Sequence, residues 1–156
     1  MIEIEIPGFK KLALAHLVLD YNGTLALDGV PLAGVRHKLS ALAKTLDIHV
    51  VTADTFGKVQ SALAGLPCNI SILPREAQDQ GKLNYIQQLG VQYTCAIGNG
   101  RNDQLMLQAA SLGICVMLAE GASVETLTAA DVVCRDIIEA LDLLCNPLRL
   151  TATLRS

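Results

Sequence analysis

This sequence of 156 residues has few charged side chains and no long apolar run. Charged residues make up 17% and apolar residues 51% of the chain, a balance that argues against intrinsic disorder. No apolar stretch approaches the roughly 20 residues that a membrane-spanning helix needs. The N-terminus alternates polar and apolar residues like a half-buried strand, and it lacks the basic start and apolar core of a secretory signal. We therefore expect a cytoplasmic globular protein without a membrane partner.

Signals for nucleic acid, disulfides and cysteine-bound metals are also missing. The formal net charge is −3, and the densest basic cluster is Lys10-Lys11, so we expect no nucleic-acid partner. Five cysteines form an odd set without C-x-x-C spacing, and most of them lie inside apolar runs. We expect buried, reduced thiols.

The apolar pattern predicts one α/β domain over residues 1–156. Short apolar runs alternate with longer stretches in which Leu, Ile, Val and Ala recur every three or four residues. The predicted strands are 12–19, 48–51, 70–73, 93–97, 113–118 and 131–133. The predicted helices are 32–46, 56–66, 76–89, 103–110, 124–129 and 136–144. No repeat, linker or low-complexity tract divides the chain.

Strict alternation of strands and helices implies a Rossmann-like, three-layer α/β/α sandwich around a mainly parallel sheet. Residues 2–6 and the long first strand are expected to pair antiparallel, with a turn at Pro7-Gly8. The sequence thus predicts an N-terminal β-hairpin extension over residues 1–12.

The stretch Leu17-Val-Leu-Asp-Tyr-Asn-Gly-Thr24 is the most informative in the chain. An aspartate at the carboxyl end of a buried parallel strand lies where open α/β sheets bind ligands, which makes Asp20 a candidate nucleophile or metal ligand. The alternative is a two-residue hairpin at Asn22-Gly23, with Asp20 as an ordinary turn residue.

Polar groups follow the first four core strands, and their order favours phosphoryl transfer. They are Asp20, Thr52 with Asp54, Lys82, and the run Gly98-Asn-Gly-Arg-Asn-Asp103. In a parallel sheet these ends share one edge, so the groups can surround one ligand. A carboxylate that attacks a phosphate dianion needs a hard cation such as Mg²⁺, fixed positive charge and hydrogen-bond donors.

Each residue also has an interpretation without catalysis. Thr52 and Asp54 are good helix N-caps, and Lys82 could be a solvated lysine on a helix surface. The glycines of Gly98-x-Gly100 suggest a dinucleotide loop, but the third glycine is missing. His16, His37 and His49 are scattered, and His16 on an apolar strand suits a core residue. These interpretations explain single residues but not the ordered set.

The ordered set resembles the haloacid dehalogenase (HAD) superfamily over residues 12–134. Asp20-Tyr-Asn-Gly-Thr24, Thr52-Ala-Asp54 and Gly98-Asn-Gly-Arg-Asn-Asp103 look most like the phosphorylation domain of P-type ATPases, and the chain resembles the soluble, stand-alone proteins of that type. The resemblance implies a Mg²⁺-dependent phosphohydrolase with a phospho-aspartyl intermediate on Asp20.

The resemblance also implies a role for each matching position. The metal would be held by Asp20, Asp103 and the backbone carbonyl of Asn22. The transferred phosphate would be bound by Thr52, Ala53, Lys82 and Asn102. Asn22 stands where typical HAD phosphatases have an aspartate that acts as general acid and base, and an amide can do neither. Loss of that group should cost about 10²–10⁴ in rate. Asn99, where the ATPases have aspartate, removes a second carboxylate.

No cap domain is expected, because residues 25–31 leave room only for a small β flap with a turn at Asp28-Gly29, and residues 73–76 leave almost none. An uncapped site admits a small phosphorylated substrate or a phosphoprotein, unless a neighbouring subunit of a homo-oligomer covers it. A phosphate-binding or phospho-aspartyl regulatory module with little turnover is the main alternative to a phosphatase. A receiver-like signalling domain fits less well, since receivers carry the phospho-accepting aspartate in mid-chain.

Overall fold

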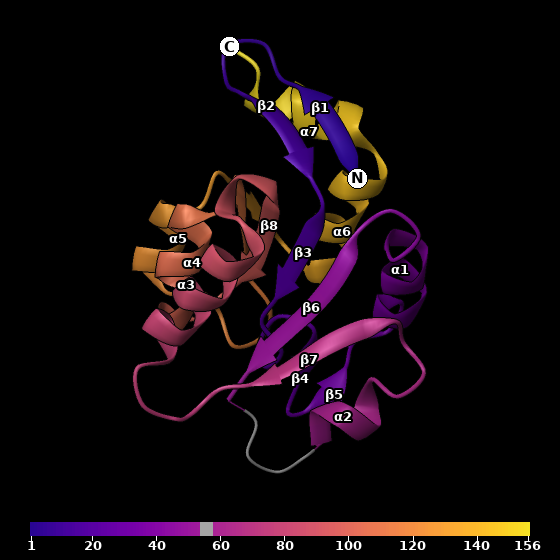
Figure 1. Ribbon diagram of the computed structural model, residues 1–156, viewed down its shortest axis with the longest axis vertical. Coiled ribbons are helices and arrows are strands. Elements are labelled where there is room, and N and C mark those ends of the chain that lie inside the picture. Colours follow the sequence, from indigo (N-terminus) through magenta and orange to yellow (C-terminus); the bar gives the residue numbers. More distant parts are fainter. Residues whose placement is uncertain (54–57) are drawn as a thin grey trace.

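A central sheet of six parallel strands organises the computed structural model, which describes residues 1–53 and 58–156. The strands lie in the order β10-β9-β8-β3-β6-β7 (Figure 1). Their bounds are β3 (His16–Leu19), β6 (Asp47–Thr52), β7 (Cys68–Ile72), β8 (Thr94–Gly98), β9 (Leu112–Val116) and β10 (Val132–Cys134).

Helices cover both faces of this sheet (Figure 1). One face carries α3 (Gln78–Leu89), α4 (Gln104–Ala109) and α5 (Val124–Ala129). The other carries α1 (Val35–Leu42) and α6 (Ile137–Cys145), followed along the chain by α7 (Pro147–Leu154). The remaining helical segments are α2 (Lys58–Ala62) and two short 3₁₀ turns, η1 (Val91–Tyr93) and η2 (Arg101–Asp103). The predicted three-layer α/β/α sandwich is confirmed.

Alternation along the strands explains the two apolar layers. Successive side chains of a strand point to opposite faces of the sheet. In β3, Leu17 and Leu19 pack into the larger core under α1 and α6, whereas Val18 packs into the smaller core with α3 and α4. All three side chains are fully buried. The near-continuous apolar runs of the sequence therefore reflect strands that are covered on both faces.

The strand order places a ligand crevice at a defined point. Chain order runs outward from β3 through β6 and β7 on one side, and then from β8 through β9 and β10 on the other. The direction of winding reverses between β3 and β8. In open α/β sheets, ligands bind outside the carboxyl ends of the strands at such a switch point. Asp20 follows β3 and Asn99 follows β8, so both residues border this point.

The predicted first strand 12–19 is in fact two strands that belong to different sheets. β1 (Ile2–Glu5) and β2 (Lys11–Leu14) form an antiparallel hairpin, which extends the predicted 1–12 extension to Leu14. The chain changes sheet at Ala15, whose backbone bonds to Tyr93 at 2.8 Å and to Asp47 at 2.9 Å. The apolar pattern continues from β2 into β3 because both strands bury side chains, so the sequence did not indicate the break between them.

Helix α7, which the sequence analysis did not predict, packs beside the N-terminal hairpin (Figure 1). Pro147 occupies its first turn, where a missing N–H costs no helical hydrogen bond. Leu150 is fully buried, and the backbone N–H of Ser156 donates to the carbonyl of Pro7 at 3.2 Å. The C-terminal residue therefore lies at the turn of the N-terminal hairpin.

A small flap follows the Asp20 loop. β4 (Ala26–Leu27) and β5 (Val30–Pro31) pair antiparallel across a two-residue turn, as expected. Asp28 and Gly29 both have positive φ, 52° and 81°, which a tight hairpin turn of this kind requires. Five residues separate β7 from α3, so neither connection holds a cap domain.

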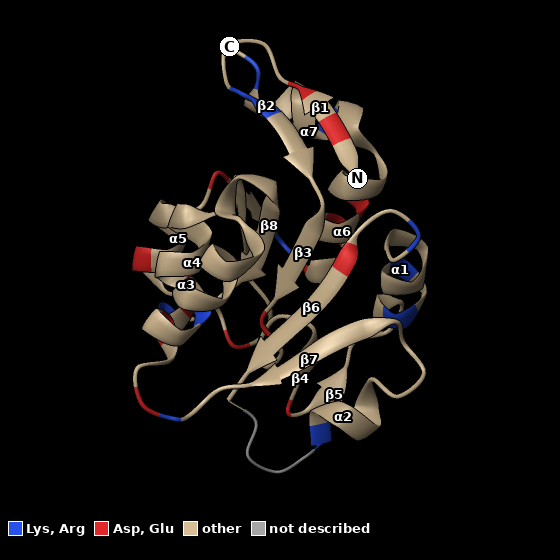
Figure 2. Ribbon diagram, viewed as in Figure 1, with Lys and Arg blue, Asp and Glu red and all other residues tan. Residues whose placement is uncertain are grey.

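Charged residues are distributed over many elements of the chain (Figure 2). Lys and Arg residues occur on the hairpin, on α1, on α2 and in the loop before α3, with acidic residues between them. In the described part of the chain, no helix is long and apolar enough to cross a bilayer. All five cysteines are free thiols.

Candidate active site

Asp20 lies at the carboxyl end of the central strand β3. Its backbone N–H donates to the carbonyl of Ile97 in β8 at 3.0 Å, which continues the parallel pairing to the last residue before the loop. The chain then turns, and the N–H groups of Leu25 and Ala26 return to the carbonyl of Tyr21 at 2.9 and 3.0 Å. A plain hairpin at Asn22-Gly23 is therefore excluded, because β3 is a parallel interior strand.

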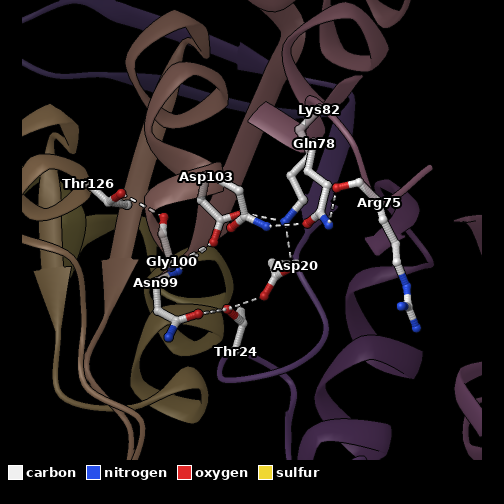
Figure 3. A network of polar contacts seen from close by, with 10 residues as sticks. Asp20, Thr24, Arg75, Gln78, Lys82, Asn99, Gly100, Asp103 and Thr126 are labelled. Atoms are coloured by element: carbon white, nitrogen blue, oxygen red, sulfur yellow. Dashed lines mark hydrogen bonds and ion pairs between the residues drawn. The ribbon is translucent and has the colours of Figure 1, made fainter. Parts of the chain in front are cut away.

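Lys82 bridges the two carboxylates of the site (Figure 3). Its Nζ lies 2.6 Å from Asp20 Oδ1 and 2.6 Å from Asp103 Oδ1. The exposed fractions of the side chains are 1% for Lys82, 11% for Asp20 and 0% for Asp103. Lys82 is thus a buried ion-pair partner, not a solvated lysine on a helix surface.

Asp103 is held on both of its oxygens. Besides the contact with Lys82, its Oδ2 accepts hydrogen bonds from the backbone N–H groups of Asn99 and Gly100, each at 2.9 Å. Gly98 makes this close approach possible, since a Cβ there would lie 2.4 Å from Asp103 Cγ. The lack of a side chain at Gly98 therefore lets the Asp103 carboxylate approach the backbone of this loop closely.

Thr24 joins the first loop to the loop after β8. Its hydroxyl lies 3.3 Å from Asp20 Oδ2 and 3.2 Å from Asn99 Oδ1, so one hydrogen is shared between two acceptors. This contact is the weakest in the network of Figure 3. The Thr24 hydroxyl thus links Asp20 to the Asn99 side chain.

The buried charges shift one another's pKa. Burial, followed by the charge of Asp103, raises the pKa of Asp20 to about 7, although Lys82 acts in the opposite direction. Burial disfavours the charged form of Lys82, but the adjacent carboxylates outweigh it and raise its pKa. One ammonium therefore faces two carboxylates.

A cavity of about 470 Å³ opens beside Asp20. Among its walls are five of the residues expected from the sequence: Asp20, Asn22, Thr52, Ala53 and Asn102. Lys82 and Asp103 are buried and are not among the lining residues, but Lys82 contacts both Asp20 and Asp103. The structure therefore brings all seven expected site residues to one edge of the sheet, whereas Asp54 lies outside the described residues.

The walls also include polar residues that the sequence analysis missed. Asn102 donates to Gln78 Oε1 at 2.7 Å, and Gln78 Nε2 donates to the carbonyl of Arg75 at 3.0 Å (Figure 3). Glu120, in the connection after β9, borders the same cavity. Their positions in the sequence could have identified them, because these residues also follow the carboxyl ends of predicted strands.

Comparison with curated proteins finds short matches. No protein-family model matches the chain. The uncharacterized protein MJ0073 of Methanocaldococcus jannaschii is 57% identical over 60 residues, which are 38% of this chain and 64% of that protein. The chain therefore spans less than two thirds of that relative. MJ0072, an uncharacterized protein of the same organism, is 41% identical over 39 residues, or 25% of this chain and 89% of that protein.

Solved structures match over nearly the whole chain. The cobalt-bound deoxy-D-mannose-octulosonate 8-phosphate phosphatase of Haemophilus influenzae superposes with a TM-score of 0.72 at 13% identity, covering 92% of this chain and 94% of that one. The corresponding Moraxella catarrhalis enzyme, in complex with magnesium, phosphate and KDO, gives 0.71 at 16% identity, covering 91% and 94%. A structure from Legionella pneumophila assigned to HAD superfamily subfamily IIIA gives 0.68 at 17% identity, covering 90% and 87%. At these identities the matches establish the fold.

Proposed function

The chain has the fold of the HAD superfamily phosphatases, and from that premise we propose that it is a Mg²⁺-dependent phosphohydrolase that forms a phospho-aspartyl intermediate on Asp20. The observation that carries this proposal is the position of the Asp20 carboxylate, which stands at the switch point of the sheet, beside Lys82 and at the wall of a cavity. No Ser, Cys or His occupies a comparable position among the residues that line the cavity in the described chain.

The donor set fits a hard divalent cation. Mg²⁺ prefers a few carboxylate and carbonyl oxygens together with water. Asp20 and the carbonyl of Asn22 would hold it, and when bound it would neutralise charge on the transferred phosphoryl group. Direct ligation by Asp103, expected from the resemblance, stays a prediction. Both oxygens of Asp103 already accept hydrogen bonds, which supports a positioning role for this carboxylate in the proposed reaction.

The remaining residues suit phosphate binding. Lys82 places a buried ammonium beside the attacking carboxylate, where low local polarity strengthens its attraction for a phosphate oxygen. Thr52, Ala53 and Asn102 line the cavity and would donate hydrogen bonds to the phosphate. In the reaction, an Asp20 oxygen attacks phosphorus while the bond from phosphorus to the leaving oxygen breaks. Water then hydrolyses the resulting acyl phosphate.

Asn22 limits both halves of this reaction. Its side chain lines the cavity but cannot protonate the leaving oxygen or take a proton from water. We therefore expect slow turnover and a preference for phosphate esters with good leaving groups. The open, uncapped site suits either a small phosphorylated molecule or a phosphorylated residue of another protein.

Replacement of Asn22 by aspartate tests the proposal. The Asn22→Asp variant should hydrolyse p-nitrophenyl phosphate faster than wild type, by up to about 10²–10⁴-fold, because a general acid and base is restored. Beryllofluoride with Mg²⁺ should raise the unfolding temperature of wild type and leave Asp20→Asn unchanged. Equal protection of both proteins, or unchanged turnover of Asn22→Asp at every pH, would exclude the phosphatase.

A regulatory module is the second candidate, and the amides at Asn22 and Asn99 favour it. Such a protein would accept a phosphoryl group on Asp20 and release it slowly. A burst of one phosphate per chain, followed by negligible turnover, would identify this behaviour. Steady turnover without a burst would favour the enzyme.

A further inference from the structure

The loop after β9 brings one more carboxylate to the candidate site. A tight turn spans residues 118–121, closed by the hydrogen bond from Gly121 N–H to the carbonyl of Leu118 at 2.9 Å. Gly121 has a φ of 74°, a conformation that glycine adopts without strain. Glu120 occupies the third position of this turn and borders the cavity together with Asp20 and Asn22.

Asn99 ties this turn to the loop after β8. Its side-chain Nδ2 donates to the carbonyl of Gly121 at 3.0 Å, and its backbone carbonyl accepts from Ser123 N–H at 2.9 Å. The first of these bonds needs the amide of asparagine, because a carboxylate at position 99 has no hydrogen to donate. The amide that removes a charge from position 99 therefore also holds the turn that carries Glu120.

The Glu120 carboxylate lies beside the Asn99 side chain. Both side chains pack against the Cα of Gly23. A Cβ placed on Gly23 would lie 2.4 Å from Glu120 Oε2 and 2.6 Å from Asn99 Nδ2. Glu120 is solvent-exposed, and within the described chain no hydrogen bond or ion pair engages its carboxylate. Its negative charge is thus available to a bound ligand.

From this juxtaposition we propose that Glu120 supplies the carboxylate that position 99 lacks, and that it strengthens divalent-cation binding at the site. The inference rests on the proposed function, since it concerns the same cation. Among the described residues that line the cavity, Asp20 and Glu120 carry the carboxylates. A group that contacts a metal or its bound water typically changes metal affinity about 10–100-fold when it is removed.

Mn²⁺ binding measured by calorimetry and by electron paramagnetic resonance tests the proposal without any substrate. Glu120→Gln should weaken Mn²⁺ binding about 10-fold or more. Glu5→Gln, which removes the same charge from the exposed N-terminal hairpin, should bind like wild type. Asp20→Asn should abolish binding. Thermal unfolding in the absence of metal should be the same for Glu120→Gln and wild type, because the Glu120 side chain is exposed.

A second variant distinguishes a charge effect from a structural one. Asn99→Asp combined with Glu120→Gln moves the carboxylate from the turn to position 99 and should recover most of the lost affinity. If Glu120→Gln binds Mn²⁺ as wild type does while Asp20→Asn does not, the role of Glu120 is refuted and the proposed function stands. If wild type binds no Mn²⁺, or Asp20→Asn binds it normally, the metal-dependent function is refuted together with this inference.

Discussion

Replacement of Lys82 by methionine would leave two buried carboxylates without the cation that lies 2.6 Å from each of them. Methionine keeps most of the apolar stem, so the change isolates the loss of the ammonium. Removal of one partner from a buried ion pair costs about 3–5 kcal/mol of unfolding free energy, since an uncompensated charge stays in the interior. At roughly 2–4 °C per kcal/mol for a domain of this size, the melting temperature should fall by about 6–20 °C.

The assay is urea unfolding of metal-free protein, followed by circular dichroism. The control is Lys38→Met, which breaks the pair between Lys38 and Asp142 and should change stability little, because solvent screens an ion pair at the surface. Addition of Asp20→Asn to Lys82→Met should restore a large part of the stability, because one of the two repelling charges is removed. A loss below about 1 kcal/mol for Lys82→Met, or no recovery in the double variant, would refute the buried-pair argument.

The pH dependence of this loss has a definite sign. The pKa of Asp20 is already raised in the folded state from its ordinary 3.8 to about 7, and removal of Lys82 raises it further. A group with a raised folded pKa adds stability at low pH, and that contribution disappears as the pH rises through the folded value. The deficit of Lys82→Met should therefore be smaller near pH 4–5 than near pH 8.

Two other changes should have measurable effects. Gly98→Ala places a methyl group 2.4 Å from Asp103 Cγ, so the carboxylate or the loop must shift. We expect the free energy of unfolding in urea to fall by roughly 1–3 kcal/mol and Mn²⁺ binding to weaken. Unaltered stability and unaltered Mn²⁺ affinity would contradict the close approach. Burial, followed by the charge of His16, lowers the pKa of His49 from its ordinary 6.5. The unfolded chain therefore binds more protons below pH 6.5, and wild type should lose stability relative to His49→Gln as the pH falls through that value. Parallel stability curves for the two proteins from pH 7 to pH 5 would show that His49 does not titrate in this way.

Sequence pattern was sufficient for the six-stranded sheet, for most of its helices and for the edge of the sheet on which the candidate site lies. Short apolar runs alternate with helical periodicity, and that alternation alone implies a parallel sheet covered on both faces. Because the carboxyl ends of parallel strands share one edge, Asp20, Thr52 and Asp103 could be assigned to one site without knowledge of the strand order. Asn22 could be identified as a departure from the phosphatase pattern because it stands at a fixed offset from Asp20.

Other features depended on packing between distant segments. The break at Ala15 and the helix Pro147–Leu154 arise because the N-terminal hairpin leaves the central sheet and packs beside the end of the chain. Neither feature interrupts the local apolar pattern. The proline in the first turn of α7 is a local signal for a helix start, but it does not show where that helix packs.

By itself, then, the sequence determined the carboxyl ends of the core strands to within two residues, because side-chain periodicity and turn residues act over a few positions. Only the tertiary structure decided that the Lys82 ammonium is buried between two carboxylates, since a lysine on an amphipathic helix can face solvent or protein. It also decided that Glu120 lies beside Asn99, 21 positions earlier in the chain. Such contacts depend on how β8, β9 and their loops pack against one another, and that packing is a property of the whole fold.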